Sequence, residues 1–242
     1  MKLLSAAALA LVAILSLSGC QKAADAAFGQ KVRAYLLEHP EVIEEAVQKL
    51  QEKKIANAAD IAKTGLVKHR KALEQDPRDF VANPNGKITV VEFFDYRCGY
   101  CKTSAPEVVK IIQDNPDVRF VFKEFPIFGG ESNLAAKVAL TPAGKAKGLA
   151  LYQSFMAEKA LDEAAIDRHL AAAGIDPAQA KAAGESAAIG KQLTDTHELA
   201  QSLGIEGTPA FIVGDRMIPG ADLPALRGAI AQAKAGDLKR VG

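Results

Sequence analysis

The sequence has 242 residues, of which 49% are hydrophobic, and this length suits one catalytic domain plus an appendage rather than several full domains. Thirty lysine and arginine residues against 29 aspartate and glutamate residues leave a formal net charge of +1. A chain so close to neutrality has no excess of positive charge for a nucleic acid or an anionic membrane surface. We therefore expect a globular protein that binds no nucleic acid.

The first twenty residues have the features of a targeting signal. Lys2 precedes an apolar run over residues 3–15, which is short for a membrane span. Leu17-Ser18-Gly19-Cys20 follows and resembles the processing site of bacterial lipoproteins, where the cysteine becomes the acylated first residue. We predict a signal peptide over residues 1–20 and a membrane anchor at Cys20. The alternative is an ordinary signal peptide cut near residues 24–26, and in either case we expect the protein to work in the periplasm or cell envelope.

Residues 21–76 are predicted to form an N-terminal helical extension. Pro40 suits the first position of a long helix, because its fixed backbone angle and missing N–H are tolerated there. Ile43, Val47 and Leu50 have the spacing of a coiled-coil seam, which polar residues interrupt further along. This pattern indicates self-association through the extension, and the alternative is a solvated spacer.

Residues 77–130 read as a β-α-β unit. The turn signal at residues 83–86 leads into an apolar run over residues 88–94 that is typical of a buried strand. Cys98 follows almost at once, and the apolar spacing beyond it predicts a helix that begins at the cysteine. A second strand is expected over residues 118–122.

The remainder of the chain divides into a helical insertion and a second strand-rich half. Residues 131–203 are rich in alanine and predict several packed helices separated near Gly144, Gly174 and Gly184. Residues 204–242 predict two strands and a closing helix. Their expected bounds are 210–213 and 216–218 for the strands and 223–235 for the helix.

The motif Cys98-Gly99-Tyr100-Cys101 has the C-x-x-C spacing of redox-active dithiols. With Cys20 set aside as an anchor, these are the two cysteines left, and a bridge that closes so small a loop would add little stability. A helix N-terminus favours a thiolate, because its unpaired N–H groups and dipole stabilise negative charge. We therefore predict Cys98 as the nucleophile and Cys101 as the thiol that resolves the mixed disulfide.

Other uses of a C-x-x-C motif fit less well. Covalent haem attachment requires a histidine where this chain has Lys102, and a structural zinc site requires two further ligands that the four isolated histidines do not supply. We expect no metal and no cofactor other than the redox-active disulfide Cys98–Cys101. Copper(I) held by the two thiolates remains an alternative from a different functional class.

Glu92 is unusual because it lies within a strand predicted to be buried on both faces, where an unpaired carboxylate is costly. We hypothesise that it lies beneath the dithiol helix with a raised pKa and exchanges a proton with Cys101. The alternative is a carboxylate that reaches solvent or a lysine.

Thr208-Pro209 stands at the entrance of the predicted strand that follows it. A cis bond here would expose neighbouring backbone N–H and C=O groups to an extended substrate strand opposite the dithiol. We therefore predict Thr208 and Pro209 as substrate-binding residues. Without the upstream dithiol the same dipeptide would indicate an ordinary turn.

A family resemblance rests on the active-site segment Val91-Glu92-Phe93-Phe94-Asp95-Tyr96-Arg97-Cys98-Gly99-Tyr100-Cys101. It is similar to that of the DsbA-like disulfide oxidoreductases, in which a buried acid also stands six residues before the first cysteine. The segment over residues 28–54 resembles the N-terminal extension of the ScsC-like branch, associated with suppression of copper sensitivity. The resemblance implies an α/β, thioredoxin-like fold with an α-helical insertion and an N-terminal helical extension.

The resemblance also implies an activity and partners. We expect a disulfide oxidoreductase that acts on reduced or misoxidised exported proteins and exchanges electrons with a membrane thiol-disulfide partner. Thr208 before the proline is similar to exported disulfide isomerases, and ScsC-like proteins with helical extensions can be trimeric isomerases. We therefore favour an oligomeric isomerase, with a monomeric dithiol oxidase as the alternative.

Overall fold

The computed structural model describes residues 28–236, which fall into two units divided between Asn57 and Ala58. The predicted signal peptide and its Cys20 lie outside these residues. Within residues 28–236, none of the helices combines the length and apolar character needed to cross a bilayer.

The described part of the first unit is helical except at residues 39–40. Residues 28–38 form one helix, and α2 (Glu41–Glu74) begins after the proline that was predicted to start it. Ile43, Val47 and Leu50 lie at helical spacing, and each is 52% exposed. They form an apolar stripe that the described part of the chain leaves half uncovered.

The second unit is built on a five-stranded mixed sheet with the strand order β1-β3-β2-β4-β5. The strands are β1 (Phe80–Ala82), β2 (Ile88–Phe94), β3 (Val118–Glu124), β4 (Ala210–Val213) and β5 (Arg216–Pro219). β2 and β3 run parallel, as a β-α-β unit requires, and the other pairs are antiparallel. The expected α/β architecture is confirmed.

The central strand β2 is buried on both faces, as predicted. Val90 and Phe94 belong to one apolar cluster, whereas Val91 and Phe93 belong to another, and each of the four is at most 1% exposed. Side chains alternate between the two faces of a strand, so Glu92 shares the face of Val90 and Phe94.

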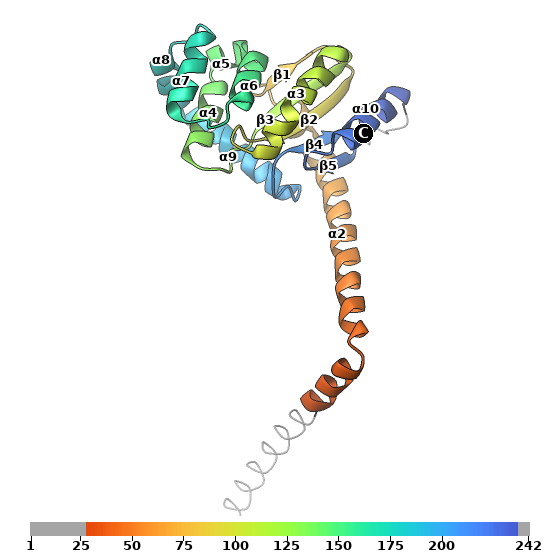
Figure 1. Cartoon of the computed structure of the whole chain (residues 1–242). Coiled ribbons are helices and arrows are strands. Elements are labelled where there is room, and N and C mark those ends of the chain that lie inside the picture. The colour runs from red at the N-terminus through yellow and green to blue at the C-terminus, as the bar shows by residue number, and fades with distance from the viewer. Residues whose placement is uncertain (1–27, 237–242) are drawn as a thin grey trace, which may run out of the picture. The chain divides into compact units, whose positions relative to one another are not determined.

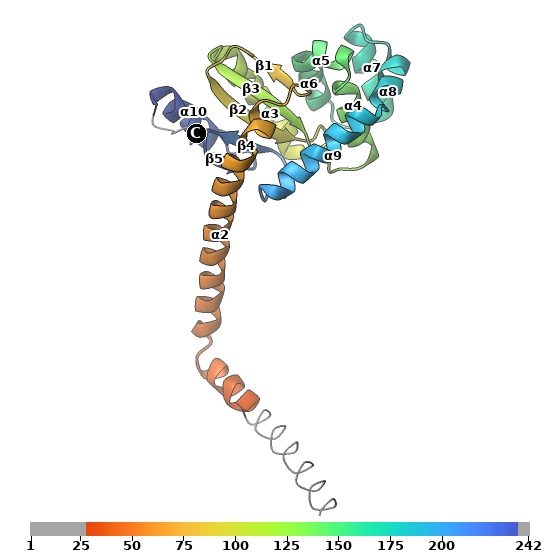
Figure 2. The same ribbon diagram turned by 180° about the vertical axis from the view of Figure 1, so that it is seen from behind.

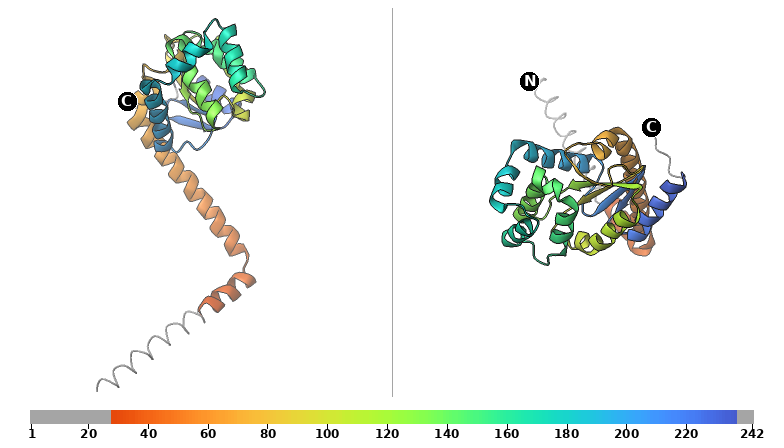
Figure 3. Two further views of the ribbon diagram at one scale, coloured as in Figure 1. Left: turned by 90° about the vertical axis from the view of Figure 1, so that its left-hand side faces the viewer. Right: turned by 90° about the horizontal axis from the view of Figure 1, so that it is seen from above.

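Helices cover both faces of the sheet. α3 (Gly99–Asp114) and α10 (Leu223–Ala235) pack in the cluster that contains Val90, whereas the last turns of α2 and α9 (Ala187–Ser202) pack in the cluster that contains Val91. Figure 1 shows α3 and α10 on the side nearer the viewer. Figure 2 shows the molecule from behind, where α9 lies nearer the viewer. The view from above in Figure 3 places the strands between these layers.

The insertion between β3 and β4 consists of short helices that gather at one end of the sheet (Figure 1). Those not yet named are α4 (Gly130–Ala139), α5 (Pro142–Ala146), α6 (Gly148–Ala157), α7 (Glu163–Ala172) and α8 (Pro177–Gly184). Gly174 follows α7 and Gly184 ends α8, in agreement with the predicted breaks.

The break predicted near Gly144 is also present, as two helix boundaries on either side of this glycine, which itself lies inside the short helix α5. The first boundary lies at Thr141, whose side chain caps α5 by accepting a hydrogen bond from the Gly144 N–H, and the second lies at Lys147. Glycine is needed at position 144 for space, since a Cβ there would lie 2.2 Å from the Val138 carbonyl oxygen.

The edge strand β1 was not predicted from the sequence. Its three residues lie just before the turn that leads into β2, and Phe80 pairs with Phe122 in an antiparallel ladder with β3. A run of three residues is too short to show a strand period.

Candidate active site

The dithiol follows the carboxyl end of β2 through a short loop that is held by Asp95. The buried carboxylate of Asp95 accepts hydrogen bonds from the Arg97 N–H (2.7 Å) and the Ser132 hydroxyl (2.8 Å). It also accepts the N–H groups of Ile127 (2.7 Å) and Phe128 (3.0 Å), which follow β3. A single carboxylate thus ties the loop before the dithiol to the loop after β3.

Cys98 is the N-cap residue of α3 and is a free thiol, only 3% exposed. Its pKa is lowered to about 5, chiefly by a hydrogen bond with the Cys101 thiol. The backbone N–H groups of Tyr100 and Cys101, which lie in the first turn of α3, lower it further. Cys98 is therefore a thiolate at neutral pH and a competent nucleophile.

Cys101 lies one turn deeper in α3, is fully buried and is also a free thiol. Burial raises its pKa far above the ordinary value, and the hydrogen bond with Cys98 and the charge of Glu92 add to this effect. The two sulfurs are thus opposite in charge, since Cys98 is ionised at neutral pH and Cys101 is protonated.

Glu92 lies on β2 and is completely buried. Burial raises the pKa of its carboxyl group, and the Tyr152 hydroxyl lowers that pKa by donating a hydrogen bond to the carboxylate. The net result is a pKa of about 8. The Tyr152 oxygen lies 3.1 Å from Oε1 and 3.2 Å from Oε2 of Glu92. The carboxyl group is thus poised to titrate near physiological pH beside Cys101.

The loop before β4 faces the nucleophile. The Thr208–Pro209 peptide bond is cis, and the Cys98 Sγ lies 3.2 Å from the Thr208 carbonyl oxygen, to which it donates a hydrogen bond when it is protonated. A groove of about 300 Å³ lined by residues 204–210 and by Met217 opens beside this loop.

The predicted site residues of the thioredoxin half thus lie together. The Cys98 sulfur contacts the Thr208 carbonyl oxygen, and the charge of Glu92 raises the pKa of Cys101. Gly99 opens the helix, and Tyr100 beside the dithiol is 73% exposed, so it faces solvent or a bound protein.

Sequence reasoning missed Tyr152 and Asp95. The signal for Tyr152 was weak, since a tyrosine in an apolar helix shows only that its hydroxyl needs a partner. That partner, Glu92, lies 60 residues away in the sequence. Asp95 stood inside the quoted motif, but its four hydrogen bonds depend on how the two loops fold.

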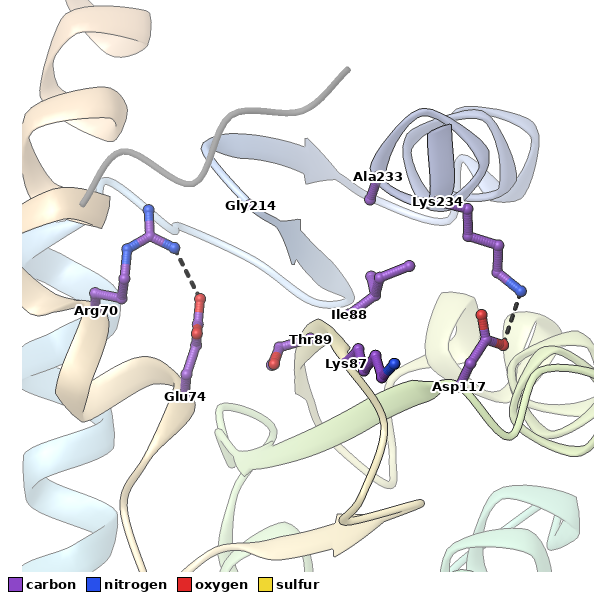
Figure 4. Close-up of a pocket in the computed structure, with 9 residues that line it drawn as sticks. All are labelled: Arg70, Glu74, Lys87, Ile88, Thr89, Asp117, Gly214, Ala233 and Lys234. Carbon is purple, nitrogen blue, oxygen red and sulfur yellow. Dashed lines mark hydrogen bonds and ion pairs between the residues drawn. The ribbon is translucent and has the colours of Figure 1, made fainter. Parts of the chain in front are cut away.

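Other polar groups in the described residues do not form a second centre of this kind. Within residues 28–236, no cluster of three or more histidine, cysteine, aspartate or glutamate side chains could hold a metal ion. Figure 4 shows a separate cavity of about 500 Å³ at the amino end of β2, away from the dithiol. Its charged side chains include the ion pairs Arg70–Glu74 (2.9 Å) and Lys234–Asp117 (2.8 Å).

The fold and the site define a class. A mixed sheet with a C-x-x-C dithiol at the start of a helix, a buried acid beneath it and a cis-proline loop opposite it belongs to proteins of the thioredoxin fold that handle disulfides. The large helical insertion separates this chain from the smallest members of that class.

Comparison with known families narrows the class. Residues 89–231 match the family model described as DSBA-like thioredoxin domain, and the chain belongs to this family. Residues 25–56 match the model described as Copper resistance protein ScsC N-terminal domain. The predicted resemblance to DsbA-like proteins with an ScsC-like extension is therefore confirmed, as is the thioredoxin-like fold.

Three relatives illustrate the similarity. The thiol:disulfide interchange protein DsbA of Bordetella pertussis is 30% identical over 138 residues, which cover 54% of this chain and 65% of that protein. Proteus mirabilis ScsC in a transitional conformation is 33% identical with a TM-score of 0.65, covering 87% of this chain and 99% of that one. BcfH of Salmonella enterica Typhimurium is 34% identical with a TM-score of 0.67, covering 85% and 94%. The chain thus spans slightly less than two thirds of the length of the DsbA relative.

Proposed function

We propose that this protein is a thiol-disulfide oxidoreductase that forms, reduces or isomerises disulfides in exported proteins through Cys98 and Cys101. The observation that carries the proposal is the contrast between the two thiols: the pKa of Cys98 is about 5, whereas burial raises that of Cys101. A nucleophile that is ionised at neutral pH and a partner that stays protonated until needed are what stepwise exchange requires.

The reductive direction begins with attack of the Cys98 thiolate on a substrate disulfide. A bond forms between Cys98 and one substrate sulfur, and the second substrate sulfur leaves as a thiolate that takes a proton from water. The extended substrate segment pairs with backbone groups beside Thr208, whose carbonyl oxygen already lies 3.2 Å from Cys98.

Resolution needs Cys101 to lose its proton. The ionised carboxylate of Glu92 accepts it, and the Cys101 thiolate attacks Cys98, so that the Cys98–Cys101 bond forms as the bond to substrate breaks. The protein has then lost two electrons and the substrate has gained two. In the oxidative direction the same steps run backwards, and protonated Glu92 returns the proton to Cys101.

The isomerase direction is favoured by the first unit. Ile43, Val47 and Leu50 form a half-exposed stripe, and the first unit matches a ScsC N-terminal domain. Association through this stripe into a homo-oligomer such as a trimer would present several dithiols to one misfolded substrate. An isomerase must also be kept reduced, so a membrane thiol-disulfide partner belongs to the proposal.

The place of action is the periplasm or cell envelope, with Cys20 as a lipid anchor. One solved relative from Salmonella, 32% identical, is described as a periplasmic thioredoxin-like protein. Labelling of cells with a radioactive fatty acid tests the anchor. The full-length protein should take up label, and the Cys20→Ala variant should not.

The activity is tested by two assays run side by side: refolding of a protein with scrambled disulfides and oxidation of a reduced protein. We expect Cys98→Ser to abolish both and Cys101→Ser to accumulate a mixed disulfide with the substrate. The ratio of the two rates in the unaltered protein separates isomerase from oxidase. Full activity of Cys98→Ser would refute the proposal.

The ionisation of Cys98 is tested by alkylation of the reduced protein with iodoacetamide between pH 3 and 9. The rate should rise with a midpoint near pH 5, about four units below the ordinary thiol value of 9.0. A midpoint above pH 8 would mean that Cys98 behaves as a free cysteine in water.

A further inference from the structure

The carboxyl group of Glu92 has strand neighbours that offer it no polar contact. In the register of the sheet it lies beside Phe122 on β3 and Phe211 on β4. A carboxylate held between two phenylalanines would ordinarily remain protonated, because nothing replaces the water it has lost. The hydroxyl group of Tyr152 from the helical insertion is the hydrogen-bond donor that the described residues supply.

Tyr152 is held rigidly in the position from which it donates. The side chain is 1% exposed, and its ring centroid lies 4.9 Å from that of Phe122 and 5.3 Å from that of Phe94. Its oxygen lies almost equally far from both oxygens of Glu92, at 3.1 and 3.2 Å. The packed ring thus fixes the hydroxyl group over the carboxyl group.

The titratable groups around Glu92 are all acids. Cys101 faces it from α3, Glu124 from β3, Tyr96 from the loop after β2 and Tyr152 from α6. Negative charge on any of these disfavours ionisation of Glu92, whereas a donated hydrogen bond favours it. Tyr152 therefore supplies the contact that opposes the effect of burial.

We propose that Tyr152 is a positioning residue for disulfide exchange, whose hydroxyl group holds the Glu92 carboxyl group in place and makes its ionised form accessible for taking the proton of Cys101. This inference rests on the proposed function. The helical insertion then has a role in the chemistry, since α6 carries the residue that adjusts the proton acceptor of the thioredoxin half.

In this role Tyr152 transfers neither an electron nor a proton. Tyr152 keeps its own proton throughout. When Glu92 is ionised the hydroxyl donates to it, and when Glu92 takes the Cys101 proton the hydroxyl remains beside the neutral acid. Transfer of that proton frees the Cys101 thiolate to attack Cys98.

The test is the pH dependence of the resolving step in the full chain. Reduced protein is mixed with oxidised glutathione, and the decay of the Cys98–glutathione disulfide is followed by acid quench and mass spectrometry from pH 5 to 10. In Tyr152→Phe we expect the midpoint to rise by about one pH unit, because the variant loses the hydrogen bond that favours the ionised carboxylate. Below the midpoint, at pH 7, the step should be about tenfold slower.

Tyr96→Phe is the matched control, because Tyr96 is also buried and donates to a carboxylate, the Glu124 Oε1 at 2.9 Å. It loses a similar hydroxyl group but leaves Glu92 its partner, so the midpoint should stay at the wild-type pH. An unchanged midpoint in Tyr152→Phe, or equal shifts in both variants, would overturn the proposal. The alkylation midpoint of Cys98 should be the same in all three proteins.

Two further measurements separate this inference from the proposed function. Tyr152→Phe added to Glu92→Gln should shift nothing further, whereas an unchanged pH profile in Glu92→Gln alone would remove the proton role of Glu92 itself. If Tyr152→Phe does not fold, 3-fluorotyrosine at position 152 keeps the ring and donates a stronger hydrogen bond. It should move the midpoint downward, and an upward shift or no shift would contradict the proposal.

Discussion

The two faces of the sheet bury acidic side chains in different ways. On the face covered by α3 and α6, Glu92 and Glu124 are buried, and tyrosine hydroxyls are the hydrogen-bond partners that the structure gives them. On the face covered by α9 and the end of α2, Asp79 meets a cation. The Lys123 ammonium group forms a buried ion pair with its carboxylate.

The ion pair is completed by uncharged groups. Lys123 also donates to the Ala72 carbonyl oxygen at 2.6 Å, and the Gln192 side-chain amide donates to Asp79 Oδ1 at 3.2 Å. These contacts join the end of α2, strand β3 and helix α9. The cluster therefore holds elements together, which is a structural task.

The two environments give the buried acids different pKa values. Burial raises the pKa of Asp79 only to about 6, because Lys123 offsets part of the effect, whereas that of Glu92 reaches about 8. At neutral pH Asp79, with its cation, is therefore mostly ionised, whereas Glu92, with a hydroxyl partner, is mostly protonated. Glu92 is the acid to which the proposed function assigns a proton transfer, and its pKa lies nearer neutral pH without a cation beside it.

The largest effect is expected from Lys123→Met, which leaves Asp79 buried without its cation. The free energy of unfolding should fall by about 3–5 kcal/mol, the usual cost of breaking a buried pair. Urea denaturation at pH 7 measures it. The pH midpoint of the resolving step should not move, and a shift there would show that the two faces are not independent. Lys123→Met combined with Asp79→Leu should recover most of the loss.

Glu92→Gln should change stability in a pH-dependent way. Because the folded-state pKa is about 8 against an ordinary value of 4.5, the folded protein holds a proton that the unfolded chain releases, so wild-type stability falls as the pH rises from about 4.5 to 8. Glutamine lacks this proton. The variant should therefore gain about 3 kcal/mol relative to wild type between pH 5 and pH 8. Parallel denaturation curves at both pH values check this, and equal differences would place Glu92 in contact with water.

The smallest effect is expected from Gln192→Met, which removes one hydrogen bond to Asp79. The loss should be about 1 kcal/mol at pH 7. It should shrink at pH 5, because Asp79, with a pKa of about 6, is then mostly protonated in the folded protein and needs the donor less. A loss that grows on acidification would mean that the amide stabilises the neutral acid instead.

The elements that carry the dithiol were predictable because local patterns determine them. The apolar run of β2, the cysteine at the start of α3 and the glycine after α10 each depend on neighbours in the sequence. The structure has β2 at Ile88–Phe94 and α10 at Leu223–Ala235, which are the expected bounds. Asp176 caps α8 by accepting the Gln179 N–H, as the Asp-Pro pair indicated.

The contacts between distant segments were not predictable in the same way. A buried acid in β2 could be recognised as costly from its apolar neighbours alone, but its partner Tyr152 could not, because nothing in an alanine-rich helix indicates which strand it will face. The cation for Asp79 is another example, since Lys123 looks like any strand-end lysine until β3 is placed beside α2.

Both outer strands of the sheet are short, three residues in β1 and four in β5, and β5 ends at Pro219, which has no N–H to offer. A neighbouring chain would therefore find few free backbone groups along either margin on which to add a strand. Under the proposed function, that resistance to sheet extension would let the protein hold unfolded substrate chains beside Thr208 without adding them to its own sheet.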